Sequence, residues 1–335
     1  MISKYFKNIS QINIKDKDLW FVANNNKVLF SDKNRNLILN SNKEGRFDEK
    51  IETKVEYYNE IERVGYPWGR NLVLNSNFKQ GLEGFRPYTG ITDVFVEDEV
   101  LHVSSINSSG RMHITQRIKR IDGQPYTISL LYSTEKSNPS TMAIGAKTYI
   151  AGGRENGTVP LQLADIKHLT SDLYLATTTF ITNRDNDIDE DIWFYFYPND
   201  NSDDTTNAPY TFIHRVQAEM SDIASKYSPA PEDLSNLKGT KYNLSTTLKK
   251  DQYYTLSVDG NFNEDDFIGV FLGNNKFIGY LQDNKITFKS NIDIDDDYIV
   301  VKSLSEEGKI RTIQFEEGDV ATEHNIALED IGLYY

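Results

Sequence analysis

Apolar and polar positions alternate with a period of two along most of the chain between residues 69 and 231. This period is typical of half-buried β-strands, whose side chains point to opposite faces in turn. Asn, Asp and Gly between the apolar runs predict turns. Helical periodicity is limited to a turn or two near residues 161–169. Strands are predicted at residues 94–96, 101–103, 113–118, 126–132, 178–181, 192–197 and 212–216.

The last third of the chain has the same pattern. Short apolar runs separated by turn residues follow one another at hairpin distances. Strands are predicted at residues 253–258, 267–272, 277–281, 285–288, 298–301 and 310–315. At the N-terminus, residues 19–22 and 28–30 flank an Asn-rich loop and predict a β-hairpin. Residues 51–61 fit a helix and a strand almost equally well.

Three stretches of the sequence occur twice, in the same order. RNLILNSN at residues 35–42 returns as RNLVLNSN at 70–77, QPYTIS at 124–129 resembles QYYTLS at 252–257, and VQAE at 216–219 resembles IQFE at 313–316. Such self-similarity indicates duplication of a whole structural module. The second copy shows no opening strand after residue 231, so we expect the repeated opening strand to pair between modules or between chains.

These patterns predict an all-β protein of tandem β-sandwich modules of jelly-roll type. Residues 1–68 would form an N-terminal hairpin and connecting segment, residues 69–233 the first sandwich, and residues 234–335 a second, shorter one. The Ser-Pro-Ala-Pro sequence at residues 228–231 is interpreted as a stiff, exposed linker.

Composition narrows the classes of function. The net charge of −14 and the lack of a basic stripe argue against nucleic acid and anionic membrane as partners. The absence of cysteine excludes disulfides, zinc–thiolate sites and thiol nucleophiles. No secretory signal opens the sequence, and no apolar stretch has the length of a membrane span. We therefore expect a protein made in a cytoplasm.

The strongest local signal is the aromatic strand at residues 192–197. Alternation places Trp193, Tyr195 and Tyr197 on one face, and Phe194 and Phe196 on the other. The phenyl rings suit a core, whereas Trp and Tyr, each with a polar group, suit a face that meets a ligand. Apolar C–H faces of sugars could stack there. The alternative is that both faces are buried against a neighbouring sheet or subunit.

Acidic residues cluster directly before that strand. Asp185, Asp187 and Asp189 could supply oxygen ligands to a structural Ca²⁺ ion, although the glycine and terminal glutamate of an EF-hand are missing. The alternative is a solvated acidic loop, and the run from Asp293 to Asp297 has the same two interpretations. No cofactor is required. The five histidines show no metal-binding spacing and no nucleophile elbow accompanies them, so no catalytic residue and no enzyme activity is predicted.

The repeated stretches also carry a resemblance. RNLVLNSNF at residues 70–78, GLEGF at 81–85, VQAE at 216–219 and ASKYSPAPED at 224–233 resemble the opening and close of carbohydrate-binding-module-like jelly rolls. Jelly rolls of this kind occur in bacteriophage tail and baseplate proteins, especially in phages of Gram-positive bacteria. Ser221 stands where this signature usually has glycine, and the second copy lacks the proline-rich exit.

The resemblance implies a structural component of a phage tail or baseplate that contributes to host cell-wall glycan binding during adsorption. It implies synthesis in the host cytoplasm, a place in the virion, and residues 1–68 as the attachment to it. The implied partners are other tail or baseplate proteins, host cell-wall polysaccharide and further copies of the chain. Two alternatives stay open: a cell-wall glycan hydrolase or its accessory module, and a purely structural spacer without a ligand.

Overall fold

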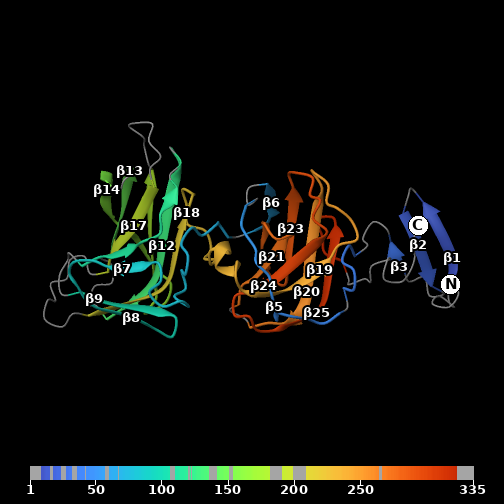
Figure 1. Ribbon diagram of the computed structural model, residues 1–335, viewed down its shortest axis with the longest axis horizontal. Helices are drawn as coiled ribbons and strands as arrows, with labels where there is room; N and C mark the ends of the chain where they lie inside the picture. The colour runs from blue at the N-terminus through green and yellow to red at the C-terminus, as the bar shows by residue number, and fades with distance from the viewer. Residues whose placement is uncertain are drawn as a thin grey trace. The chain divides into compact units, whose positions relative to one another are not determined.

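The computed structural model describes residues 9–322, except for residues 16–17, 24–27, 32–35, 42, 57–59, 67, 106–109, 120, 122, 136–141, 151–153, 182–190, 199–208 and 264–265. Its regular elements are strands apart from one short 3₁₀ helix, η1 (Pro231–Leu234). The chain divides into two compact units. One is Pro67–Ala230, and the other combines Met1–Tyr66 with Pro231–Tyr335. The predicted all-β class is confirmed (Figure 1).

The unit Pro67–Ala230, called the inserted module below, is a sandwich of two antiparallel sheets. In the first sheet the strand order is β14 (Arg154–Leu163), β13 (Ala143–Ile150), β17 (Asp191–Tyr197), β10 (Met112–Ile114) and β7 (Phe85–Pro87), and β11 (Ile118–Lys119) also pairs with β17. In the second sheet the order is β15 (Asp165–His168), β16 (Tyr174–Ile181), β12 (Pro125–Thr134), β18 (Tyr210–Glu219), β9 (Val100–Ser105) and β8 (Ile91–Glu97).

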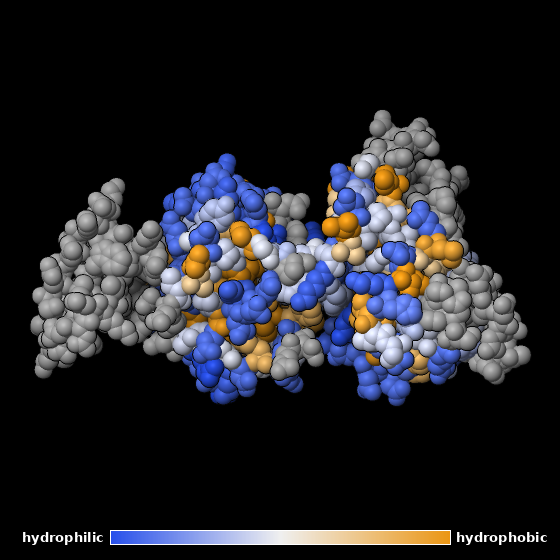
Figure 2. Space-filling view, turned by 180° about the vertical axis from the view of Figure 1, so that it is seen from behind, coloured by the Kyte–Doolittle hydropathy of each residue, from blue (hydrophilic) through white to orange (hydrophobic). Residues whose placement is uncertain are grey.

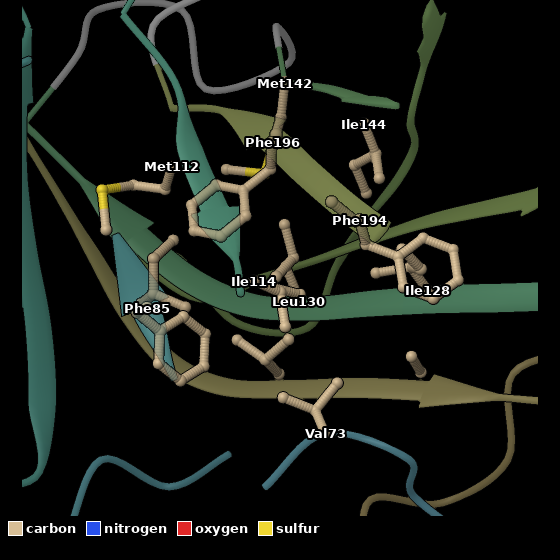
Figure 3. Close-up of a cluster of buried hydrophobic side chains, with 14 of the residues drawn as sticks. Val73, Phe85, Met112, Ile114, Ile128, Leu130, Met142, Ile144, Phe194 and Phe196 are labelled. Atoms are coloured by element: carbon tan, nitrogen blue, oxygen red, sulfur yellow. The ribbon is translucent and has the colours of Figure 1, made fainter. Parts of the chain in front are cut away.

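One hydrophobic core fills the space between these two sheets (Figure 3). Phe85, Ile128 and Phe194 are buried in it, and Leu72 packs against it. Phe194 and Phe196 point inward, as the alternation along their strand predicts. The repeated opening of this module and its aromatic strand therefore belong to the same two-sheet fold.

The second unit contains another sandwich, called the outer module below. In its first sheet the strand order is β22 (Lys276–Tyr280), β21 (Ile268–Leu272), β24 (Tyr298–Ser303), β19 (Lys238–Asn243) and β5 (Glu49–Lys50). In its second sheet the order is β4 (Gly45–Arg46), β25 (Lys309–Glu317), β20 (Tyr253–Asn261), β23 (Lys285–Ser290) and β6 (Ile61–Val64). Figure 1 shows β5 and β6, in blue, among the orange and red strands. Residues from both ends of the sequence thus build one core.

This division differs from the predicted one. Residues 35–66 belong to the outer module, and the inserted module interrupts that module instead of preceding it in tandem. The second copy therefore does have an opening segment, of which the structure describes residues 36–41. Among the described residues, neither opening segment is a regular strand, and each packs onto the last strand of its own module and not onto the other module as expected. The sequence did not show this domain organisation, because the insertion separates the two halves of the outer module along the chain.

A buried asparagine in each opening segment makes that connection. In the inserted module, Asn71 Nδ2 donates to the backbone oxygens of Val216 at 3.1 Å and Ser228 at 2.9 Å. Its Oδ1 accepts from the backbone N–H groups of Val73 at 3.0 Å and Ala218 at 3.2 Å. The side-chain amide thus joins the first segment of the module, its last strand and its exit.

The outer module repeats the arrangement with Asn36. Its Nδ2 donates to the backbone oxygen of Ile313 at 3.0 Å, and its Oδ1 accepts from the N–H groups of Ile38 at 3.1 Å and Phe315 at 3.0 Å. We call Asn36 and Asn71, with these bonds, the asparagine clasps. Each clasp satisfies buried backbone groups that would otherwise lack partners.

The other two repeats are also structural equivalents. Gln217 Nε2 donates to Glu219 Oε1 and to Ser225 Oγ, each at 2.9 Å, and Glu219 Oε1 accepts from the Ser225 N–H at 2.8 Å. The same three bonds recur in the outer module with Gln314, Glu316 and Thr322. In the remaining repeat, the Tyr126 and Tyr254 hydroxyls both accept from the N–H five residues earlier. The predicted duplication is therefore present in three dimensions.

Three local predictions need correction or confirmation. The Ser-Pro-Ala-Pro segment is buried, not exposed, because the Asn71 clasp binds the Ser228 oxygen and Gln217 Oε1 accepts from the Ser228 N–H at 3.0 Å. The predicted helical turns near residues 161–169 are strands β14 and β15. The N-terminal hairpin is confirmed as β2 (Asp18–Ala23) and β3 (Val28–Ser31), with β1 (Ile9–Lys15) as a third strand.

The outer module also contains a fully buried lysine. Lys302 Nζ donates to the backbone oxygens of Leu234 and Ser235, each at 2.9 Å, to Thr53 Oγ1 at 3.1 Å, and to the backbone oxygen of Ile51. One ammonium thus joins the segment before the insertion to the segment after it. Burial lowers the pKa of Lys302 to about 8.

We predict that Asn71→Ala destabilises the inserted module by roughly 3 kcal/mol, because several buried backbone groups lose their partners at once. Asn36→Ala should destabilise the outer module instead. Urea unfolding followed by tryptophan fluorescence separates the two, since two of the three tryptophans, Trp68 and Trp193, lie in the inserted module and the third, Trp20, lies in the N-terminal hairpin. The control is Asn243→Ala, an exposed asparagine of β19. Equal effects of Asn71→Ala and Asn243→Ala would contradict the clasp.

Lys302 should make the stability of the outer module depend on pH. Its pKa is about 8 when folded against 10.5 for the free side chain, so between these values the unfolded chain binds more protons. The free energy of unfolding then rises with pH across this window. Lys302→Met should remove this rise, whereas exposed Lys285→Met should keep it. Parallel pH profiles for the wild type and Lys302→Met, measured by urea unfolding, would refute this assignment.

Candidate aromatic binding face

The outer side of the first sheet of the inserted module carries aromatic and cationic side chains in register. In one row across the strands, Arg86 of β7 pairs with His113 of β10, His113 with Tyr195 of β17, and Tyr195 with Gly145 of β13. Their chain neighbours, including Phe85, face the core. Strand alternation therefore places these four residues together on the outer face.

A second row lies two residues along each strand. The Tyr88 N–H donates to the Arg111 backbone oxygen at 2.9 Å, the Arg111 side chain donates to the Tyr197 hydroxyl at 3.4 Å, and Tyr197 pairs with Ala143. We call the two rows and Trp193 the aromatic face. It comprises Arg86, Tyr88, Arg111, His113, Trp193, Tyr195 and Tyr197.

The rings of this face pack on one another around Arg111. The guanidinium lies over the Tyr88 ring at 4.3 Å and over the Tyr195 ring at 5.5 Å. His113 stacks on Tyr88 with ring centroids 5.0 Å apart and planes inclined by 9°. Cation–π attraction and ring stacking both favour this arrangement. The face is therefore fixed before any ligand arrives.

Tyr195 lies at the base of this face because Gly145 makes room for it. A Cβ atom on Gly145 would lie 2.2 Å from the Tyr195 ring. Only glycine accommodates a ring at that distance, and the ring consequently lies over β13. Tyr195 is 4% exposed, so it supports the face and does not form its surface.

Trp193 stands at the other end of the face, where it is half-buried. Arg117 lies over its ring at 5.5 Å and forms an ion pair with Asp191 at 3.7 Å. Asp191 is the one acidic residue in the sequences of β7, β10, β13 and β17. The face thus offers aromatic rings and cations and almost no carboxylates.

The structure brings Trp193, Tyr195 and Tyr197 to one face, on the side opposite Phe194 and Phe196, as the alternation predicts. Their role in binding stays a prediction. The burial of Tyr195 agrees with the packing interpretation for that residue, whereas Trp193, Tyr197 and the 47%-exposed Tyr88 remain accessible. The sequence analysis did not identify Tyr88, Arg86 and Arg111 as part of this face. One signal was present, because His113 lies between the apolar residues 112 and 114 and so was expected to point outward.

A second aromatic cluster, also missed from the sequence, lies on the outer side of the other sheet. Phe95, His102 and Phe212 form a row across β8, β9 and β18, with ring centroids 4.5 Å and 5.0 Å apart along it. The Tyr210 hydroxyl donates to Asp93 at 2.6 Å, and this hydrogen bond raises the pKa of the tyrosine. We call these five residues the β8–β9–β18 cluster. They have no arginine among them.

His214 lies on β18 beside that row. Burial lowers the pKa of its imidazole, and Nε2 is 2.9 Å from Ser133 Oγ. Elsewhere, apolar residues on the side shown in Figure 2 form separate patches among hydrophilic ones. Isolated exposed apolar residues are common on folded proteins and do not mark a site.

The predicted calcium ligands Asp185, Asp187 and Asp189 lie outside the described residues. The other acidic run is described, and its members anchor loops. Asp293 Oδ1 accepts from the Lys250 N–H at 2.8 Å, and the Asp296 carboxylate pairs with Lys276 at 2.6 Å. Among the described residues, no group of three or more His, Asp or Glu side chains is arranged to hold a metal ion.

Comparisons with known proteins give weak matches only. No family model matches the chain, and no curated protein matches it significantly. A CBM4 structure is 16% identical, covering 44% of this chain and 99% of its own, with a TM-score of 0.32. The tandem CBM22-1–CBM22-2 domain of Paenibacillus barcinonensis Xyn10C is 10% identical, covering 76% and 99%, with a TM-score of 0.33.

A third match is the enzymatically active domain of tailspike protein 4 of bacteriophage CBA120. It is 12% identical, covering 45% of this chain and 21% of its own, with a TM-score of 0.30. TM-scores of this size carry no argument about function. Within the described ranges, no helix has the length and apolar character needed to cross a membrane.

We predict that Gly145→Ala destabilises the inserted module by about 1–3 kcal/mol, because the new methyl group overlaps the Tyr195 ring. Near-UV circular dichroism should show the change in the packing of the aromatic face. The double variant with Tyr195→Ala should lose less stability than the sum of the two single losses, since the overlap is then gone. Strictly additive losses in the double variant would show that Gly145 does not carry the Tyr195 ring.

Proposed function

We propose that this protein is a structural component of a bacteriophage tail or baseplate, and that its inserted module binds glycan of the host cell wall. The observation that carries the binding proposal is the aromatic face, on which accessible rings stand over a rigid base. Tyr88, Trp193 and Tyr197 provide the surface, and Tyr195 supports it.

The chemistry of the face suits a sugar. Pyranose rings have apolar C–H faces that stack on aromatic rings, while their hydroxyls need hydrogen-bond donors and acceptors nearby. Tyr hydroxyls and arginine N–H groups supply such hydrogen-bond partners. Because Arg111 already orders the rings, binding requires little additional loss of side-chain freedom, which favours affinity.

The assignment to a phage tail rests on the resemblance of the opening and closing motifs. Of residues 1–68, the expected attachment, those from 35 on contribute to the outer module. Residues 1–34 would therefore attach the protein to the virion, and other tail or baseplate proteins would be its partners. We further propose that the chain forms homo-oligomers. Several copies on one particle would convert weak stacking at single sites into strong attachment, because binding of the later copies is effectively intramolecular.

We propose a binding role and not hydrolysis. Glycosidases generally use two carboxylates that flank the scissile bond. On β7, β10, β13 and β17 the one acid, Asp191, is paired with Arg117. The spacer interpretation, without any ligand, is the second candidate, and the burial of Tyr195 favours it.

Binding of the full-length protein to purified host cell walls tests the proposal. Trp193→Ala and Tyr88→Ala should each weaken binding about tenfold or more, because the variant loses the buried apolar area of the ring and in addition a stacking energy of ~0.5–1.5 kcal/mol. Sedimentation with the walls, or biolayer interferometry on immobilised wall glycan, gives the dissociation constant. Release of reducing sugar should stay at background.

The matched control is Phe95→Ala, which removes an exposed ring from the second sheet of the same module. Loss of binding with Phe95→Ala alone would move the site to the β8–β9–β18 cluster and overturn the assignment to the aromatic face. Absence of wall binding by the unmodified oligomer would leave the spacer interpretation. Reducing sugar released by the wild type would favour the hydrolase.

A further inference from the structure

The aromatic face has a charge opposite to that of the whole protein. The chain carries −14 at pH 7, yet Arg86, Arg111 and Arg117 all lie on or beside this face. Asp191 is the one acid in the sequences of β7, β10, β13 and β17. At physiological ionic strength, charges are screened within about 8 Å. A ligand at the face therefore responds to these arginines more than to the net charge.

Two of the arginines are available to a ligand. Arg86 is exposed, and no carboxylate partner accompanies it among the described residues. Arg111 is held against Tyr88 and Tyr195 and donates to a tyrosine hydroxyl. No acid in the described part of the chain pairs with it. Arg117 differs, because Asp191 already compensates it.

Arg86 and Arg111 also stand close together. The register pairs Arg86 with His113. Arg111 lies two residues before His113, directly before β10, and its guanidinium packs on the rings of the same face. Diagonal positions of this kind are about 7–8 Å apart on an antiparallel pair. Two guanidinium groups on long side chains can therefore reach one anionic group or two successive groups of a polymer.

From this placement we propose that the ligand of the aromatic face is an anionic glycan, with phosphate or carboxylate groups in its repeating unit. A sugar ring stacks on the accessible aromatic rings, and Arg86 and Arg111 bind the acidic group. Planar guanidinium matches both oxyanions with two parallel N–H donors, whereas ammonium acts as a point charge. This inference rests on the proposed glycan-binding function.

The test uses the full-length protein and three polymers: poly(glycerol phosphate), polygalacturonate and uncharged dextran. Binding to at least one anionic polymer should exceed binding to dextran and should fall as salt is raised. Comparison of the first two polymers distinguishes phosphate from carboxylate. Arg86→Gln should weaken anionic binding about tenfold, the loss expected for one charge-assisted contact. Arg86→Lys should restore part of it.

The matched control is Arg311→Gln, an exposed arginine of the outer module. Arg86 is the informative position because its replacement disturbs none of the ring contacts, and unchanged circular dichroism verifies that. Wall binding that needs Trp193 but ignores salt and Arg86→Gln would overturn the anionic inference and keep the proposed function. If neither walls nor any polymer bind, the proposed function fails, and this inference fails with it.

Discussion

Each sandwich depends on one side-chain amide at the point where its first segment meets its last strand. An asparagine offers two donors and an acceptor with two lone pairs in one plane, and both clasps use donor and acceptor sides together. Its donor and acceptor sides can therefore bond a backbone carbonyl and a backbone N–H of one strand at once. The requirement explains why the octapeptide is the part of the duplication that has changed least, with one conservative replacement in eight residues.

Much of the fold was predictable because period-two patterning and the repeats act within short windows. The core positions Phe194 and Phe196, the hairpin near residue 20 and the duplication all follow from local sequence. The insertion of one module into the other was not predictable in this way. The hydrogen bond from Asn36 to Ile313 spans 277 residues, and no local pattern in the intervening sequence marks where the outer module is interrupted. For the aromatic strand, the sequence left binding and burial open and did not single out Tyr195. That ring is buried because it packs over Gly145 of β13 and beneath Arg111, which directly precedes β10.

The aromatic face and the core of the inserted module share the same strands. Phe194 and Phe196 fix β17 from inside, so the rings on its outer side inherit a defined spacing and direction. Gly145 and Ala143 on β13 leave room for those rings to lie against the sheet. A binding face built in this way is as rigid as the sandwich itself. Because few side chains then lose freedom on binding, even shallow stacking contacts give useful affinity.

The nested topology has a consequence for folding. The outer module must join residue 36 to the strand ending at residue 317, across a long intervening chain. Loop-closure entropy grows only with the logarithm of loop length, by about 0.6 kcal/mol for each doubling, so the insertion costs little even when unfolded. The entropic cost of closing this loop is smaller once the inserted module has folded. Trp68 and Lys226, near the two ends of that module, then form a parallel bridge that holds the ends together. The Asn71 clasp closes a separation of 145 residues, so the inserted module can close first and bring together the two halves that Asn36 then joins.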